Sequence, residues 1–398
     1  MVDNSSKLKT EIERLKREKN AVILAHYYTL PEVQEVADFL GDSLALSIEA
    51  QKTDARIILF AGVHFMAETA KVLSPEKKVL LPNLEAGCSL AESCDAAAFA
   101  AFKAKYPGYK VVSYVNTSVG VKALTDVCCT SSNALKVVES IPADQPIIFA
   151  PDRNLGSYIQ KLTGRENMVI WDGACHVHEE FSLEKILELK RQHPAAQVVV
   201  HPECRAYIVQ VADFVGSTAA ILDYCGKSSA REFIVVTEAG ILAEMKRRYP
   251  EKEFIPAPPD DETCGCNNCK YMKMVTLENI CACLENESPE IVLDDEVRRA
   301  AELLKKYRQG KVNLERRIID NEQFWKLRHW PQMEKKGEGG NPGDPQPTSG
   351  WLVNCILSKH ADAMDCYPEP TVLPREPGDR AEAAKPVSYT HLRAHETG

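Results

Sequence analysis

Two kinds of segment each occur three times in the first ~270 residues of the sequence. Both kinds begin with an apolar run of strand length and continue with an amphipathic stretch of helical period. The first kind ends on a small hydroxylated cluster, and its copies are residues 21–43, 110–132 and 196–218. The second kind ends on cysteine, and its copies are residues 56–88, 145–175 and 231–266. Repetition of one strand-and-helix unit indicates a chain built from similar modules.

The repeat therefore predicts an α/β protein made of three similar α/β/α modules of about 85 to 90 residues, each with a small parallel sheet covered by helices. We hypothesise that the modules pack around a pseudo-threefold axis with the active site at the centre. The predicted division is a first module at 1–88, a second at 89–175, a third with a C-terminal helix at 176–309, and an atypical tail at 310–398.

Polar residues recur where the strands of the first kind of segment end. These are His26, Tyr114 and His201, and a serine follows each of them 16 or 17 positions later, namely Ser43, Ser131 and Ser217. Ligands bind at the carboxyl ends of parallel strands, so these positions predict a shared site. The alternative is that polar residues lie at strand ends in any case, and that a serine before a helix only caps it.

The charge and the N-terminus narrow the class of protein. The first 20 residues form a charged helical pattern without the apolar core of a signal peptide, and the sequence has no run of ~18 to 20 apolar residues. We therefore expect a cytoplasmic protein without a membrane partner. The net charge of −9 has the wrong sign for nucleic-acid binding. In a reducing compartment, the 14 cysteines are core thiols, nucleophiles or metal ligands and not a disulfide framework.

Three of the cysteines occupy matching places, one in each module: Cys88, Cys175 and Cys269. Three thiolates from separate loops suit a 4Fe-4S cluster with one iron not held by protein, whereas structural zinc sites use four ligands. Such an open iron would act as a Lewis acid. Taken alone, the Cys-x-Cys-x-x-Cys run at 264–269 is also compatible with a local zinc site or redox pair. In the repeat context, Cys264 and Cys266 neighbour the ligand and could form a reversible disulfide.

The remaining cysteines are mostly predicted to be buried apolar residues, because they lie within or beside apolar runs. This group consists of Cys128, Cys129, Cys204, Cys225, Cys281 and Cys283. Cys94 receives no assignment.

Many short motifs, in order over residues 20–285, resemble the quinolinate synthase family: AHYY, LGDS, AGCSLA, SYVNTS, CTSSNA, WDGACHVH, VHPEC, VGST and CxCNNCxYMKM. Lys270 departs from the proline common there in the family. The resemblance implies the three-module fold, a 4Fe-4S cluster on Cys88, Cys175 and Cys269, and additional site residues at Tyr28 and His178. It also implies a substrate-binding set, namely His26, Ser43, Tyr114, Val115, Asn116, Ser131, His201, Pro202, Glu203 and Thr218.

The family's reaction condenses iminosuccinate with dihydroxyacetone phosphate to give quinolinate for NAD biosynthesis. The implied functional partner is an aspartate oxidase or dehydrogenase that supplies iminosuccinate. Forming the ring requires proton transfers by groups with pKa values near neutrality, which suits His26, His201 and Glu203. We expect Glu203 to be the general base, with its pKa raised by burial and by neighbouring negative charge. The sequence contains neither a Gly-x-Gly-x-x-Gly run nor a P-loop, so we do not expect a bound dinucleotide or ATP.

Other side chains of the implied set suit binding and charge stabilisation. Tyr28 and Tyr114 could donate hydrogen bonds to an oxyanion. Hydroxyl groups beside helix N-termini could hold carboxylates or a phosphate, and these belong to Ser43, Ser131 and Thr218.

The C-terminal part carries different expectations. Residues 288–309 are predicted to form a closing helix, with acids in its first turn and bases in its last. Most of 335–398 is predicted to be disordered, and the final PVSYTHLRAHETG resembles translated adapter sequence. The rival functions are a cluster-bearing redox sensor, a zinc-stabilised binding protein and an aconitase-like hydro-lyase. Phosphate release from dihydroxyacetone phosphate would separate the hydro-lyase from the synthase.

Overall fold

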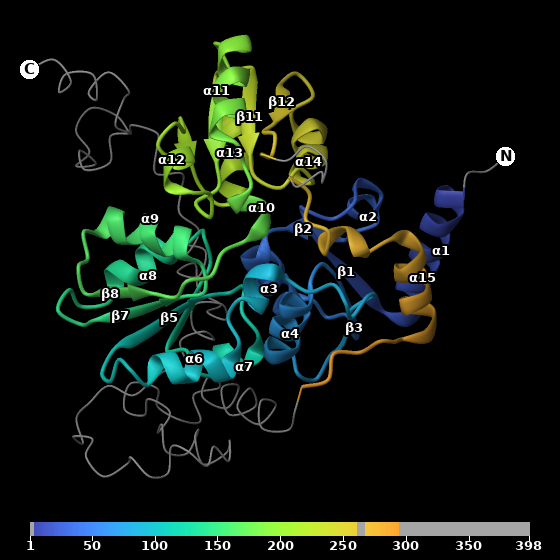
Figure 1. Cartoon of the computed structure of the whole chain (residues 1–398). Helices are drawn as coiled ribbons and strands as arrows, with labels where there is room; N and C mark the ends of the chain where they lie inside the picture. Colours follow the sequence, from blue (N-terminus) through green and yellow to red (C-terminus); the bar gives the residue numbers. More distant parts are fainter. Residues whose placement is uncertain (1–3, 261–266, 294–398) are drawn as a thin grey trace, which may run out of the picture.

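The computed structural model describes residues 4–260 and 267–293 and contains three four-stranded parallel sheets (Figure 1). Each sheet has the same strand order, in which the first strand along the chain lies between the second and the third, and the fourth lies outside the third. Figure 1 shows the three sheets in separate lobes that meet at the middle of the molecule. The predicted α/β fold with three similar modules is confirmed.

The first module contains the sheet β2-β1-β3-β4. Its strands are β1 (Ala21–His26), β2 (Phe39–Gly41), β3 (Ile57–Ala61) and β4 (Lys78–Leu80). Its helices are α1 (Asn4–Lys19), α2 (Pro31–Glu35), α3 (Ser43–Lys52) and α4 (His64–Leu73). The central strands β1 and β3 are buried along almost their whole length, as expected for parallel strands covered on both faces.

The second module contains the sheet β6-β5-β7-β8. Its strands are β5 (Lys110–Tyr114), β6 (Val127–Cys129), β7 (Ile147–Ala150) and β8 (Met168–Ile170). Its helices are α5 (Ser89–Glu92), α6 (Ala96–Lys103), α7 (Val119–Lys122), α8 (Ala134–Ser140) and α9 (Arg153–Thr163). Helix α9 is followed by Gly164, whose φ of 64° is the left-handed conformation that favours glycine after a helix.

The third module contains the sheet β10-β9-β11-β12. Its strands are β9 (Gln197–Val200), β10 (Phe214–Val215), β11 (Glu232–Val236) and β12 (Glu253–Pro256). Its helices are α10 (His176–Glu179), α11 (Leu183–Gln192), α12 (Ala206–Val209), α13 (Thr218–Lys227) and α14 (Ile241–Arg248). The chain then continues into a short 3-10 helix, η1 (Met272–Met274), and into α15 (Leu277–Asn286).

An aspartate before the second strand repeats with the modules. Its carboxylate accepts a 2.7 Å hydrogen bond from a backbone N–H of the first strand, 15 residues earlier, in all three modules. The pairs are Asp38 with Ile23, Asp126 with Val111, and Asp213 with Val198. The same bond at the same spacing shows that the three modules share one local backbone plan, and not only a similar order of elements.

Alternate residues of the strands pack into different cores. In each module, one face of the sheet contributes to a core that is shared by all three modules, for example through Phe60, Phe149 and Phe233. The opposite faces pack into three separate cores, one for each module. Because the inner faces share one core, the sheets hold the carboxyl ends of their strands in fixed relation to one another.

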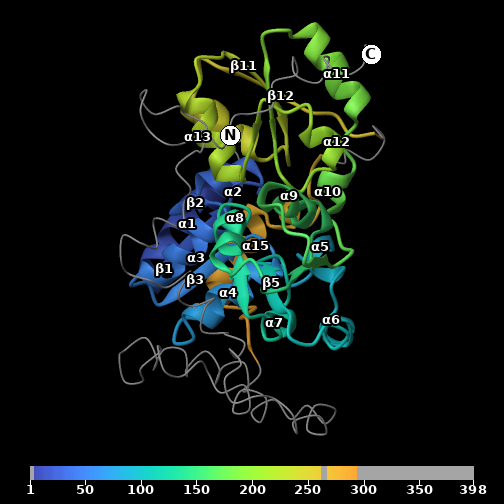
Figure 2. The same ribbon diagram turned by 90° about the vertical axis from the view of Figure 1, so that its left-hand side faces the viewer.

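Helix α15 packs against the first module, although the predicted division counts its residues with the third. Ile280 and Leu284 share a core with Ile12 and Leu15 of α1 and with Ile57 of β3. Figure 1 shows α15 beside α1, and Figure 2, which turns this view by 90°, shows β11 and β12 of the third module above α15. An amphipathic pattern reveals that a helix has a buried face but does not reveal which surface covers it.

The return of α15 makes a prediction for stability. Ile280→Ala is expected to lower the free energy of unfolding by about 2–5 kcal/mol, because the Ile280 side chain is fully buried between α1 and the first sheet. The control is Glu285→Ala, an exposed position on the same helix, where a change within about 0.5 kcal/mol is expected. Urea unfolding of both variants checks this, and equal stability of the two would mean that α15 does not stabilise the fold.

Parts of the chain lie outside the described residues. These parts include Cys264 and Cys266, residues 294–309 of the predicted closing helix, and the tail at 310–398. The predicted start of that helix at residue 288 was wrong, because residues 288–293 are not helical and their backbone instead pairs beside β4, where the N–H of Ile291 donates to the carbonyl of Val79 (2.8 Å). Within the described ranges, no helix combines the length and the apolar character that crossing a bilayer requires.

Candidate active site

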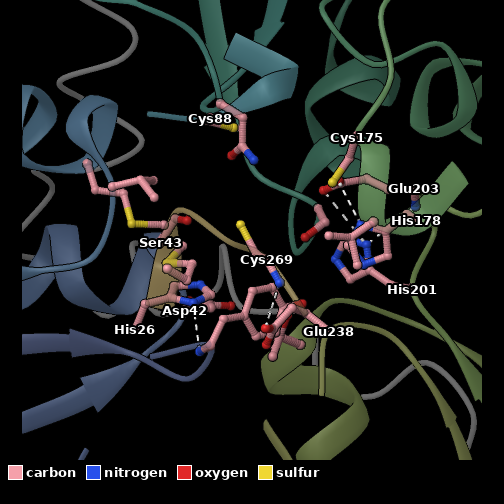
Figure 3. A pocket seen from close by; sticks show the side chains of 18 of the residues that line it. His26, Asp42, Ser43, Cys88, Cys175, His178, His201, Glu203, Glu238 and Cys269 are labelled. Carbon is pink, nitrogen blue, oxygen red and sulfur yellow. Dashed lines mark hydrogen bonds and ion pairs between the residues drawn. The ribbon is translucent and has the colours of Figure 1, made fainter. Parts of the chain in front are cut away.

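A cavity at the junction of the three modules gathers most of the predicted site residues (Figure 3). The space within it that is free of protein atoms is about 660 Å³, and this volume includes the part that is open to solvent. The predicted residues that line it are His26, Tyr28, Ser43, Cys88, Tyr114, Asn116, Ser131, Cys175, His178, His201, Glu203, Thr218 and Cys269. Val115 and Pro202 are buried beside these residues but do not line the cavity.

Equivalent strand ends in the first and third modules carry a histidine with the same hydrogen bond. The Nδ1 atom of His26 accepts from the backbone N–H of Tyr28 (3.1 Å), and Nδ1 of His201 accepts from the N–H of Glu203 (3.3 Å). Each bond fixes the tautomer, because a neutral ring whose Nδ1 accepts carries its proton on Nε2. Both rings can therefore donate a hydrogen bond through Nε2 to a bound group.

The pKa values of these two histidines differ from the prediction. Burial lowers the pKa of His26 to about 3, with further lowering by the charges of Lys273 and His201. Burial likewise lowers the pKa of His201 to about 3, although the charge of Glu203 opposes this. The expectation of pKa values near neutrality was wrong for both residues, because full desolvation disfavours the imidazolium. At pH 7 they are neutral hydrogen-bond donors.

The buried histidines make the stability of the fold dependent on pH. Between the unfolded pKa of about 6.5 and the folded pKa of about 3, the folded state binds fewer protons than the unfolded state. The free energy of unfolding is therefore expected to fall as the pH falls through this window, by about 1.4 kcal/mol per pH unit for each histidine. Urea titrations of the full chain at several pH values between 7 and 4 measure the slope.

His26→Gln is expected to flatten this slope, because glutamine does not titrate. The control is the unaltered chain, measured in parallel over the same pH range. An unchanged slope in His26→Gln would contradict the assignment of this pH dependence to burial of the neutral ring.

Glu203 lies in a fully buried polar cluster that joins the second and third modules. Tyr114 donates a 2.6 Å hydrogen bond to Glu203 Oε1, and His178 Nδ1 lies 3.3 Å from Oε2. The ring of His178 stacks on the ring of His201, with centroids 4.7 Å apart. Burial raises the pKa of Glu203, but positive charge on His178 and His201 and the hydrogen bond from Tyr114 outweigh this effect and lower the pKa to about 2. The predicted upward shift was wrong, because sequence alone did not place two histidines against this carboxylate.

The two tyrosines of the cavity remain protonated donors. The hydroxyl of Tyr28 hydrogen-bonds to Thr218 Oγ1 (2.6 Å) and to Thr237 Oγ1 (2.7 Å), and Thr237 in turn contacts His178 Nε2 (3.0 Å). Burial raises the pKa of Tyr28 and of Tyr114 well above its usual value. Both phenols therefore keep the O–H proton at any physiological pH, and Tyr114 donates its proton to Glu203.

The hydroxyl residues lie beside the starts of helices. Asp42 caps α3 by accepting from the N–H of Ala45, so Ser43 is the first residue of the helix and not its cap. In the third module, Ser217 caps α13 by accepting from Ala220, and Thr218 lines the cavity. The alternative that a serine before a helix only caps it is therefore correct for Ser217, whereas Ser43 and Thr218 line the cavity.

The three predicted ligand cysteines lie in loops of different modules. Cys88 precedes α5, Cys175 precedes α10, and Cys269 comes shortly before η1. Burial raises the pKa of Cys88 to about 12 and raises the pKa of Cys175 and Cys269 as well. The charge of Cys269 further raises the pKa of Cys88, so the thiolates repel one another. Cations placed between them would stabilise all three thiolates.

The remaining described cysteines largely follow the prediction. Cys94 and five of the six cysteines predicted as buried apolar residues are at most 3% exposed: Cys128, Cys129, Cys204, Cys225 and Cys283. Cys281 is only partly buried.

Two further buried acids line the cavity, Asp42 and Glu238, and neither was among the site residues predicted from the sequence. Glu238 accepts from the backbone N–H of Cys269 (3.0 Å) and from Lys273 Nζ (2.8 Å), and Lys273 also donates to the carbonyl of Tyr28 (2.6 Å). This arrangement links the Cys269 loop to the first module. Glu238 lies two residues after β11, so its place at a strand end was the available signal.

The fold and the cavity together define an enzyme in which three α/β modules surround one polar site. The family model described as quinolinate synthetase A protein matches residues 10–306. A relative from Chloroherpeton thalassium, named quinolinate synthase, is 57% identical over 291 residues, which cover 73% of this chain and 90% of the relative. A second relative, from Thermosynechococcus vestitus and also named quinolinate synthase, is 58% identical over 290 residues, which cover 73% of this chain and 91% of the relative. The chain belongs to the quinolinate synthase family.

Proposed function

We propose that this enzyme condenses iminosuccinate with dihydroxyacetone phosphate to give quinolinate, one phosphate and two waters, a step of de novo NAD biosynthesis. The observation that carries the proposal is that three cysteines and the polar strand-end residues of all three modules line one cavity. The names of the close relatives agree with it. An aspartate oxidase or dehydrogenase is the class of enzyme that would supply iminosuccinate.

The donor set fits a 4Fe-4S cluster held by Cys88, Cys175 and Cys269. These thiols line the same cavity, come from different loops, and have raised pKa values that neighbouring iron cations would lower. When bound through three cysteines, the cluster would supply one iron with Lewis-acid character toward a substrate oxygen.

Glu203 is proposed as the general base of the proton transfers. Its low pKa keeps it ionised at neutral pH, and the hydrogen bond from Tyr114 holds its Oε1 in place. The carboxylate is fully buried, so a proton taken from substrate would stay in a water-poor cavity.

The other polar residues are proposed to bind and orient the substrates. His26 and His201 would donate through Nε2–H to the substrate carboxylates, since their Nδ1 atoms already accept from the backbone. Ser43, Ser131 and Thr218 would hold a carboxylate or the phosphate with the helix starts beside them. Asn116 has a buried Oδ1 without a hydrogen-bond partner, which would accept from a substrate donor.

The test is anaerobic reconstitution of the full chain with iron and sulfide in zinc-free buffer, followed by addition of both substrates. We expect about four irons per chain and the appearance of quinolinate and phosphate. A cluster without quinolinate or phosphate would favour the aconitase-like hydro-lyase. A chain that assembles no cluster would contradict the assignment of the cysteines.

A further inference from the structure

Three chemically different metal donors meet on one side of the cavity. The Cys175 Sγ atom, a ring nitrogen of His178 and a carboxylate oxygen of Glu203 all lie within 4.8 Å of one another (Figure 3). Cys175 and His178 are three residues apart at the start of α10, and Glu203 comes from the loop after β9. Thiolate, imidazole and carboxylate are the three kinds of ligand that Zn²⁺ accepts.

The ring of His178 is held in the orientation of a metal ligand. Its Nε2 hydrogen-bonds to Thr237 Oγ1 (3.0 Å), and Thr237 is itself fixed by the hydroxyl of Tyr28. Metal-binding histidines characteristically use one ring nitrogen for such an outer contact and the other for the metal. His178 is 3% exposed, and its Nδ1 makes no aligned hydrogen bond although Glu203 Oε2 lies 3.3 Å away. This nitrogen is therefore a buried polar atom without a hydrogen-bond partner, and its lone pair could bind a metal.

The charges of the group match a divalent cation. One thiolate and one carboxylate carry two negative charges, and the imidazole is neutral when Nδ1 binds a metal. A dipositive ion would leave the buried site with no net charge, which removes the main cost of burying ions. The side of the ion toward the cavity would stay open to water, as in zinc sites with three protein ligands.

We propose that the chain lacking its cluster binds one Zn²⁺ through Cys175 Sγ, His178 Nδ1 and the Glu203 carboxylate. Binding releases the thiol proton of Cys175 to solvent. Cys88 and Cys269 take no part. Since Cys175 is also a proposed cluster ligand, the ion and the cluster exclude each other; this second statement rests on the proposed function, whereas the ion site does not.

The test titrates the full chain, freed of metal by a chelator under reducing anaerobic conditions, with Zn²⁺ in competition with a chromophoric chelator. We expect one tight Zn²⁺ per chain, with affinity nearly lost in Cys175→Ala and His178→Ala. Thr237→Val removes the outer contact of His178 together with the hydrogen bond between Thr237 and the Tyr28 hydroxyl, and it is expected to weaken binding about 10–100-fold. Cys88→Ala and Cys269→Ala are the matched controls and should keep the full affinity.

Two outcomes would overturn the site. Affinity lost equally in Cys88→Ala, Cys175→Ala and Cys269→Ala, with His178→Ala unaffected, would place the ion on the three thiols. Absence of tight Zn²⁺ binding in the unaltered chain would remove the site altogether. Circular dichroism of each metal-free variant identifies losses of affinity that come from misfolding. In Thr237→Val, Co²⁺ is used in place of Zn²⁺, because its charge-transfer absorption reports the thiolate contact.

Mutual exclusion is tested separately. Zn²⁺ added before iron and sulfide should lower the iron incorporated per chain, and His178→Ala should restore it. Full iron incorporation in the presence of bound Zn²⁺ would contradict the exclusion. A chain that binds Zn²⁺ at this site but never assembles a cluster would contradict the proposed function and leave the ion site standing.

Discussion

Replacing any one of Cys88, Cys175 and Cys269 by alanine is expected to abolish cluster assembly. Each module supplies one of the three thiols, so the remaining two modules offer no replacement at the same place. The expected change is from about four irons per chain to nearly none after anaerobic reconstitution, measured as iron and acid-labile sulfide together with the visible absorption of the cluster.

The matched control for the cysteine series is Cys128→Ala. Cys128 is also a thiol, but it is only 3% exposed, lies in β6 and packs in the shared core instead of lining the cavity. Its variant should assemble a normal cluster. If any of the three cavity variants also assembled a normal cluster, that cysteine would not be a ligand.

Glu203→Gln is expected to keep the cluster and lose most of the turnover. Glutamine has nearly the same shape and can still accept the hydrogen bond from Tyr114, but it cannot take up a proton at neutral pH. Loss of a general base typically lowers the rate about 10²–10⁴-fold. The measurement is the rate of quinolinate formation, divided by the iron content of each preparation.

A control for this variant is Glu253→Gln, at an exposed residue of β12 remote in the chain from the cavity-lining loops. It should leave the rate per cluster unchanged. Near-normal turnover in Glu203→Gln would show that another group serves as the base, while a Glu203→Gln preparation without a cluster would instead make Glu203 necessary for assembly.

Most of the fold could be predicted from the internal repeat in the sequence. Apolar strand runs followed by helical periodicity predicted three parallel sheets, and the polar residues at their strand ends do meet in one cavity. This worked because the direction of parallel strands and the place of their ends follow from local pattern. The position of α15 on the first module did not follow, since its apolar face fits any apolar surface.

The electrostatics of the site were the least predictable part. Glu203 was expected to have a raised pKa, and the outcome depends on His201, two residues earlier in the chain, and on the approach of His178 from α10. Glu238 was missed because a single acid after a strand resembles many exposed acids, and only the folded chain reveals its bond to the Cys269 loop. Contacts between elements of the third module that are far apart in the sequence decide both effects, and no local pattern encodes them.

One backbone plan, used three times, places different side chains around the same point. Two cavity-lining residues, two positions apart, lie at the end of each first strand or directly after it, and the pairs are His26 with Tyr28, Tyr114 with Asn116, and His201 with Glu203. The three sides of the cavity therefore carry different side chains, and a ligand at its centre would be held at three different points. An asymmetric substrate can match all three sides in only one orientation, so the cavity can determine which end and which face of the substrate meets the reacting groups.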